Sequence, residues 1–144
     1  MIEIRQFSEK DAEEVFSILK ENFENPWSLN IIKEKNPFSI KIVAKIGEQI
    51  AGFLSGEIII DEGNILMIAV KKDFQRKKIG EKLLKEFLKV AREKDVKKVF
   101  LEVSEKNIPA LNFYRKHGFK IAYVRKKYYK NGENAIVMEK EIFS

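Results

Sequence analysis

The feature that most constrains the fold is an apolar strand pattern followed by a long amphipathic helix and a second strand. Residues 65–70 form a continuous apolar run, which is typical of a strand in the middle of a sheet. Residues 79–91 then carry apolar side chains at helical spacing, and residues 96–103 form a second strand pattern. A strand–helix–strand crossover places its two strands parallel within one sheet. The pattern therefore predicts an α/β fold.

Weaker patterns on either side of this crossover complete the element order. Gly47 and Glu48 predict a tight turn between two strands, and residues 61–64 predict another turn. The predicted strands are 2–7, 39–46, 49–60, 65–70, 96–103, 119–124 and 134–142, and the predicted helices begin near Ser8, Ser28, Ile79 and Asn107. We expect one domain over residues 1–144, with a mixed central sheet of about seven strands and about four helices on its two faces.

The composition excludes several classes of chemistry. The chain has no cysteine, so it has no disulfides, no thiolate metal ligands and no cysteine nucleophile. It shows no metal-ligand spacing, and no apolar run approaches the roughly 20 residues of a membrane span. We therefore expect no metal, no membrane partner and a cytoplasmic protein. The formal net charge of +6 favours a polyanionic partner: nucleic acid, anionic lipid or a phosphate-rich cofactor.

A basic turn over residues 71–78 joins the apolar strand to the long helix. The first turn of a helix has free N–H groups and a positive dipole end, and both attract phosphate. Arg76, Lys77 and Lys78 add positive charge, and Gly80 lets the backbone approach an anion closely. These residues predict a diphosphate site at 75–80, although a solvated basic turn without a ligand has the same composition.

The run from Gln75 to Gly80 resembles the Q/R-x-x-G-x-G/A motif of the GNAT N-acetyltransferase superfamily, and the resemblance extends over nearly the whole chain. It implies that acetyl-CoA is the co-substrate and that the Val70 amide polarises its thioester carbonyl. It also implies that the strand ending at Val70 separates from its neighbour near residue 102 to hold the pantetheine arm. Lys78 replaces the middle glycine of the motif, and we expect its charge to add to the phosphate site. The implied cofactor-binding residues are Ile68, Ala69, Val70, Gln75, Arg76, Lys77, Lys78, Ile79, Gly80, Asn107 and Ala110.

A second cluster begins in the strand over residues 96–103. Glu102 is a carboxylate inside an apolar strand, which is costly to bury unless it is paired or functional. Taken alone, Glu102 could lie on an outward face and Tyr114 could pack in the core. The order Leu-Glu-Val, Asn-x-x-Ala-x-x-Phe-Tyr and Gly-Phe is similar to RimI-like ribosomal-protein-alanine and archaeal N-terminal acetyltransferases. This resemblance implies that Glu102 is the general base, Tyr114 the general acid, and Asn107 a ligand of the pantetheine arm.

A third cluster concerns the acceptor substrate. The segment Arg125-Lys-Lys-Tyr-Tyr129 resembles the one that lines the peptide cleft in the same group. It implies that Tyr128 and Tyr129 hold the first residues of a peptide and that the region of Trp27 forms the opposite wall. Taken alone, two tyrosines near a turn are typical of an ordinary strand. His117, at a helix end, is expected to make a favourable dipole contact and is assigned no catalysis.

Together these patterns predict transfer of acetyl from acetyl-CoA to the N-terminal α-amine of a protein, such as a ribosomal protein, by direct attack in a ternary complex. An α-amine has a pKa of roughly 7.7–8.0, so a base must remove its proton before attack. Two alternatives remain open: acetylation of a lysine or a small amine, and a non-catalytic CoA- or nucleic-acid-binding module. We expect nucleic acid only through a ribosomal target, because the basic residues do not alternate with exposed aromatics.

Overall fold

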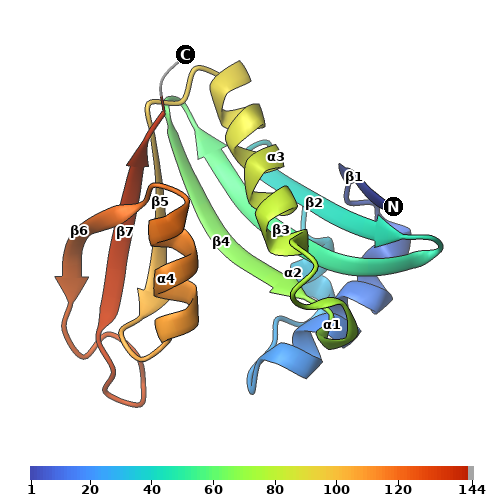
Figure 1. Ribbon diagram of the computed structural model, residues 1–144, viewed down its shortest axis with the longest axis horizontal. Coiled ribbons are helices and arrows are strands. Elements are labelled where there is room, and N and C mark those ends of the chain that lie inside the picture. Colours follow the sequence, from blue (N-terminus) through green and yellow to red (C-terminus); the bar gives the residue numbers. More distant parts are fainter. Residues whose placement is uncertain (143–144) are drawn as a thin grey trace.

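The computed structural model describes residues 1–142, in which seven strands form one mixed sheet in the order β1-β2-β3-β4-β5-β7-β6 (Figure 1). The strands are β1 (Ile2–Gln6), β2 (Ser39–Ile46), β3 (Gln49–Ile59), β4 (Glu62–Val70), β5 (Lys98–Ser104), β6 (Lys120–Arg125) and β7 (Ala135–Glu141). The helices are α1 (Ala12–Asn22), α2 (Leu29–Lys33), α3 (Ile79–Glu93) and α4 (Ile108–Lys116), with short 3-10 turns η1 (Glu9–Asp11) and η2 (Lys72–Phe74). The predicted fold class and element order are confirmed.

Two apolar layers hold helices against the two faces of this sheet. On one face, α3 buries Leu83, Leu84 and Phe87 against a cluster that includes Leu101 of β5. On the other face, α1 and α2 pack against Phe53 and its neighbours on β2 and β3. Each large apolar side chain buried in this way contributes about 1.5–3 kcal/mol, so the two layers fix the positions of the strands between them.

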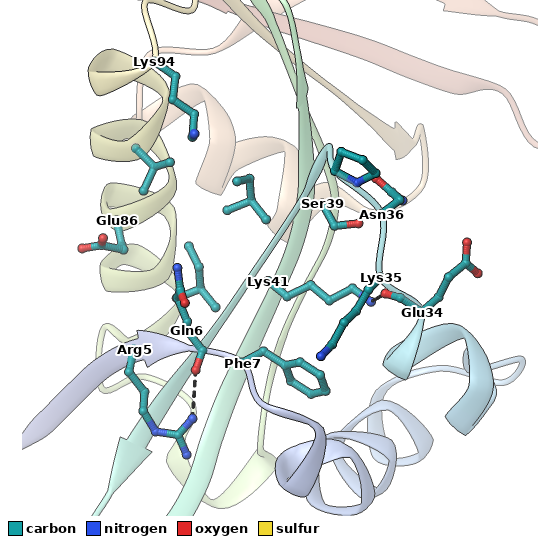
Figure 2. A pocket seen from close by; sticks show the side chains of 14 residues that line it. Arg5, Gln6, Phe7, Glu34, Lys35, Asn36, Ser39, Lys41, Glu86 and Lys94 are labelled. Carbon is teal, nitrogen blue, oxygen red and sulfur yellow. Dashed lines mark hydrogen bonds between the residues drawn. The ribbon is translucent and has the colours of Figure 1, made fainter.

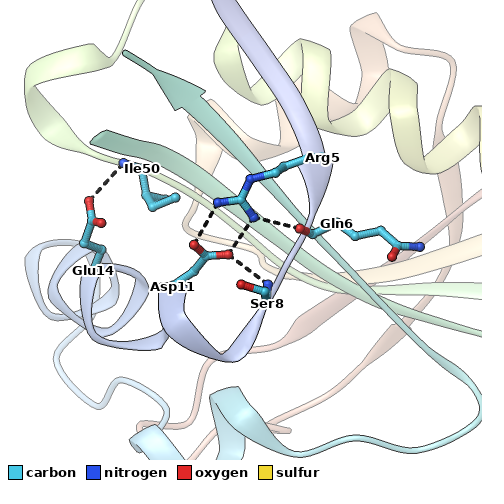
Figure 3. A network of polar contacts seen from close by, with 6 residues as sticks. All are labelled: Arg5, Gln6, Ser8, Asp11, Glu14 and Ile50. Carbon is cyan, nitrogen blue, oxygen red and sulfur yellow. Dashed lines mark hydrogen bonds and ion pairs between the residues drawn. The ribbon is translucent and has the colours of Figure 1, made fainter. Parts of the chain in front are cut away.

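A polar network fixes the first helix to the first strand (Figure 3). The Arg5 guanidinium donates two hydrogen bonds, of 2.8 and 2.9 Å, to the Asp11 carboxylate, which also accepts from the Ser8 N–H at 2.8 Å. The hydrogen bonds from Arg5 lower the pKa of Asp11. Glu14 of α1 accepts a hydrogen bond of 3.0 Å from the Ile50 N–H. The predicted helix start at Ser8 is therefore a 3-10 turn that Asp11 caps, and α1 follows it.

The predicted turn at residues 61–64 lies earlier and is shorter: it covers Ile60 and Asp61, and its extension to residue 64 is wrong. Glu62 is already the first residue of β4, and the segment up to Ile65 pairs with β3 on one side and with β5 on the other. Pairing with both β3 and β5 gives hydrogen bonds to more backbone groups than a turn can, and it outweighs the turn preference of Gly63 and Asn64. The reversal occurs at Ile60, whose φ is 57°. Among the helices described here, none is long and apolar enough to cross a membrane.

Candidate active site

The parallel pair at the centre of the sheet opens partway along its length. β4 and β5 are paired only from Glu62–Lys98 to Ile65–Leu101. Beyond this point β4 continues beside β3 and β5 continues beside β7, so the two strands diverge (Figure 1). Leu66 is an extra residue in the β3–β4 register, directly after the last parallel pair. Such bulges bend a strand and end its pairing, and the expected separation near residue 102 is confirmed.

Both strands present unpaired backbone groups to this gap. The Lys71 N–H donates to the Ala51 carbonyl at 2.8 Å, so the alternation of an antiparallel ladder turns the N–H and C=O groups of Ile68 and the N–H of Val70 away from β3 and leaves them unpaired. On β5, the same alternation turns the backbone of Glu102 away from β7. An extended ligand that carries amide groups can therefore form hydrogen bonds with β4 on one side of the gap and with β5 on the other.

The turn at the start of α3 is shaped to bind an anion. Arg76 and Lys78 have positive φ angles of 68° and 63°, which is unusual for residues with side chains. Within residues 1–142, the backbone N–H groups from Arg76 to Glu81 have no hydrogen-bond partner. Alternating left-handed residues at a helix N-terminus form a concave nest of N–H groups that binds phosphates. The expected diphosphate of coenzyme A fits these donors.

Side chains fix this turn to the end of β4. The Val70 carbonyl accepts hydrogen bonds from Asn22 Nδ2 at 3.1 Å and from Gln75 Nε2 at 3.4 Å. Gln75 Nε2 also lies 3.5 Å from Asn22 Oδ1. The Val70 N–H is then left facing the gap, next to the anion-binding turn. Gln75 therefore positions the turn, in addition to lining its cavity.

A cavity of about 290 Å³ lies over the turn. Gly80 forms part of its wall, and a Cβ atom added there would lie 3.7 Å from Phe113 and 3.8 Å from Val70. Six of the predicted cofactor residues line the cavity, whereas Ile68, Ala69, Lys77, Asn107 and Ala110 do not. The lining residues are Val70, Phe74, Gln75, Arg76, Lys78, Ile79, Gly80, Glu81, Phe113, Lys116 and His117.

A larger cavity, of about 580 Å³, contains Glu102. Of the two placements left open for Glu102, the structure shows the outward one: strand alternation turns Leu101 and Val103 into the core and Glu102 to the opposite face, where its side chain is 35% exposed. Glu102 Oε1 lies 3.4 Å from Arg125 Nε. The lining residues are Glu62, Asn64, Ile65, Leu66, Phe100, Leu101, Glu102, Tyr123, Arg125, Tyr128 and Val137.

Tyr114 lies on α4, and Asn107 is the residue directly before this helix. The Tyr114 ring makes edge contacts with Phe113 and Phe119, with centroids 5.2 and 5.6 Å apart. Burial raises the pKa of Tyr114 to about 12, so the phenol keeps its proton at neutral pH. Asn107 Oδ1 accepts a hydrogen bond of 3.2 Å from the Ala110 N–H, which caps α4. The Asn107 amide nitrogen has no partner within the described part of the chain and can donate to a ligand.

The predicted peptide-binding residues divide into two groups. Tyr128 lines the Glu102 cavity, and its ring centroid lies 5.3 Å from that of Tyr129. Asn134 fixes this segment by accepting from the Lys127 N–H at 2.8 Å. Trp27, in contrast, is half-buried against the apolar cluster of α1, α2 and β3, and it is not part of the Glu102 cavity.

Some residues of the site were missed from the sequence. Arg125 was noted only as part of the Tyr128 segment, and its pairing with Glu102 depends on β6 reaching β5 across β7. Asn22 lies at the end of α1, 48 residues from Val70, and its residue type gave no signal. Across residues 1–142, no group of three histidine, cysteine or acidic side chains is placed to hold a metal ion.

A further cavity, of about 490 Å³, lies at the opposite end of the sheet and contains none of the predicted site residues (Figure 2). Its central cation is Lys41, whose Nζ donates to the carbonyls of Ile31, Ile32 and Glu34. These bonds end α2, and burial lowers the pKa of Lys41. Arg5, also in this wall, is bound to Asp11. Lys41 and Arg5 therefore support the fold.

Known proteins share both the sequence and the fold. The model of the acetyltransferase (GNAT) family matches residues 2–119. The ribosomal protein bS18-alanine N-acetyltransferase of Haemophilus influenzae is 31% identical over 142 residues, covering 94% of this chain and 95% of that protein. The N-alpha-acetyltransferase of Sulfurisphaera tokodaii is 29% identical over 152 residues, covering 94% and 90%.

Among solved structures, the ribosomal-protein-S18-alanine N-acetyltransferase from Escherichia coli has a TM-score of 0.92 and 26% identity, covering all of this chain and 96% of that one. The family match spans most of the chain, including β4, the anion-binding turn and Glu102. The chain therefore belongs to the acetyltransferase (GNAT) family and is an acetyl-CoA-dependent N-acetyltransferase.

Proposed function

We propose that the enzyme transfers acetyl from acetyl-CoA to the N-terminal α-amine of a protein, in the cytoplasm where proteins are made. The observation that carries this proposal is the Glu102 cavity, which adjoins the point where β4 and β5 separate. Acetyl-CoA enters from the α3 side, with its diphosphate on the turn at 76–81 and its pantetheine arm between the strands. The thioester then lies beside Val70, and the amine approaches from the Glu102 side.

The transfer is a direct attack that needs no enzyme nucleophile. The amine nitrogen bonds to the thioester carbon, the proton of the amine passes to Glu102 directly or through water, and the C–S bond breaks. The coenzyme A thiolate takes a proton from Tyr114, whose neutral phenol is the form present at neutral pH. The Val70 N–H stabilises the oxyanion, and a donor of this kind is typically worth about 3 kcal/mol in the transition state.

The shape of the Glu102 cavity favours a peptide acceptor. It is about 580 Å³ in volume and opens on the face of β4 and β5 that α3 does not cover. Tyr123 and Tyr128 supply aromatic walls, and Arg125 lies over both rings at 5.6 and 5.4 Å. An α-amine also needs less help to lose its proton than a lysine, because its pKa is roughly 2.5 units lower. The names of the relatives support a ribosomal protein as the target.

The test measures acetyl-CoA turnover on peptides with free and with blocked N-termini. We expect turnover only on free N-termini, and a loss of at least about 10-fold in Glu102→Gln. Glu48→Gln, in the exposed turn between β2 and β3, is the matched control and should keep full activity. Turnover that persists on blocked peptides would move the acceptor to lysine or a small amine. Tight coenzyme A binding without turnover on any amine would favour a non-catalytic module.

A further inference from the structure

We propose that His117 and Lys116, at the end of α4, form a second wall of the diphosphate site, and that the imidazolium form of His117 binds the coenzyme A diphosphate. Cofactor binding then takes up a proton. The inference rests on acetyl-CoA as the acyl donor and holds whichever amine is the acceptor. It assigns a binding role to the only histidine of the chain.

The geometry places the end of α4 opposite the anion-binding turn. Lys116 and His117 line the cavity of about 290 Å³ whose other wall contains Arg76 and Lys78. The His117 ring lies 4.8 Å from the ring of Phe113, which is also part of that cavity. An anion held by the N–H groups at 76–81 therefore has cationic side chains on both sides.

His117 is available to such a ligand. In the part of the chain that the structure describes, neither ring nitrogen has a hydrogen-bond partner. Its charged neighbours are Glu81 and Lys85 on α3, Lys116 on α4 and Lys140 on β7, in addition to the cations of the turn. Glu81 is already paired with Lys85 at 3.0 Å. Burial and three lysines therefore oppose the charged form of the ring before a ligand binds, and Glu81 is the one neighbour that favours it.

These surroundings have a definite effect on the free protein. Burial lowers the pKa of His117; Glu81 opposes this change, and the smaller effects of Lys116, Lys85 and Lys140 add to it. The ring is then mostly neutral at pH 7. A diphosphate within about 4–6 Å raises such a pKa by about 1–3 units. Since the bound state has the higher pKa, affinity is greatest at low pH and falls as pH rises through the range between the two values.

The experiment measures proton uptake on ligand binding by calorimetry, at about pH 6.5, in buffers with different heats of ionisation. The ligand is dephospho-coenzyme A, which keeps the diphosphate but lacks the 3′-phosphate, a group that itself titrates near pH 6. We expect uptake of a fraction of one proton, and an affinity that falls about 3- to 10-fold between pH 5.5 and 8. His117→Gln should abolish both effects while binding persists.

Two comparisons make the outcome decisive. Lys116→Gln should weaken binding at every pH and leave the proton uptake intact, because lysine stays charged throughout this range. Uptake that is undiminished in His117→Gln, or absent in the unaltered enzyme, would overturn the proposal. Acceptor specificity is measured separately with the peptide series, so failure of the N-terminal assignment does not affect this result. A Tm within about 2 °C of the unaltered enzyme shows that each variant is folded.

Discussion

Glu102 and Arg125 form an ion pair across the floor of the larger cavity, with 3.4 Å between Oε1 and Nε. Glu102 lies on β5 and Arg125 on β6, and β7 separates the two strands. Within residues 1–142 the Arg125 guanidinium pairs with no other carboxylate, and it donates a hydrogen bond of 3.1 Å to the Tyr123 hydroxyl. The pair therefore fixes the orientation of the carboxylate toward the cavity.

We predict that Arg125→Gln lowers kcat for peptide acetylation by about 10-fold, because a freely rotating carboxylate spends less time in reach of the amine. The dissociation constant for coenzyme A should not change, since Arg125 lies in the acceptor cavity. Steady-state kinetics and calorimetry measure the two quantities. Lys126→Gln, the exposed neighbour, serves as the control. An unchanged kcat in Arg125→Gln would show that the pair does not orient the base.

Tyr114→Phe tests the proton donor. The ring packing on Phe113 and Phe119 is retained, so we expect the fold to persist while kcat falls about 10²-fold.

The raised pKa of Tyr114, about 12, also affects stability at high pH. Because this value exceeds that of the unfolded chain, the contribution of the neutral phenol to stability is present below about pH 10 and lost as pH rises toward 12. Between about pH 8 and pH 11, the free energy of unfolding measured with urea should fall less in Tyr114→Phe than in the unaltered enzyme.

The fold could be predicted from the sequence because its elements are marked by period and by turn residues. The crossover of β4, α3 and β5 was clear, since a continuous apolar run and a helical stripe follow each other within 40 residues. The start of β4 was missed because Gly63 and Asn64 have turn preferences, and pairing with two neighbouring strands overrides them. The turn preference of a residue carries no information about a strand that pairs with it from a distant part of the sequence.

In the candidate site, too, the parts that lie within one short segment were predicted, and the parts that depend on distant strands were not. The anion-binding turn was predicted because most of its donor groups lie between Gln75 and Gly80, within one local pattern, whereas Asn22, Lys116 and His117 come from distant segments. The environment of Glu102 was not predicted, because its exposure and its partner Arg125 depend on how β6 and β7 are placed. Trp27, expected in the wall opposite Tyr128 and Tyr129, is half-buried against the cluster of α1, α2 and β3 and lies outside the Glu102 cavity, so its role stays a prediction.

Gly56 tests the contact between β3 and α3. A Cβ atom at this position would lie 2.5 Å from Phe87 Cε1 and 2.7 Å from the Asn64 carbonyl oxygen. Phe87 is fully buried, so its ring has little room to move. We predict that Gly56→Ala lowers the free energy of unfolding by about 1–3 kcal/mol, measured by urea denaturation. The control is Gly80→Ala, where the same atom meets only ordinary contacts of 3.7 Å or more and should change stability little.

Asp11 gives a prediction about acid stability. The hydrogen bonds from Arg5 lower the pKa of its carboxyl below the unfolded value, so its contribution is present above about pH 4 and lost as pH falls below that value. Asp11→Asn should cost about 1–3 kcal/mol at pH 7 and progressively less at lower pH. Urea unfolding at about pH 7 and pH 3 measures the difference. Equal costs at both values would show that the charge of Asp11 does not contribute.

Substitutions of Lys78 test two properties of the anion-binding turn: the strain of its backbone and the charge that it offers to coenzyme A. Its φ of 63° lies in the left-handed region, which costs a side-chain-bearing residue about 1–2 kcal/mol, so Lys78→Gly should raise the free energy of unfolding by about 1 kcal/mol. The same change removes a cation that lines the cofactor cavity and should weaken coenzyme A binding about 3- to 10-fold.

Lys78→Asn is the matched variant, because asparagine tolerates a positive φ but carries no charge. If the charge matters, both variants lose affinity by similar factors, and the loss shrinks as salt is added. If Lys78→Gly instead binds coenzyme A more tightly than Lys78→Asn and the unaltered enzyme, the long side chain obstructs the phosphates, and the expectation that it adds to the site is wrong. Calorimetric titration with coenzyme A, together with urea unfolding of all three proteins, distinguishes these outcomes.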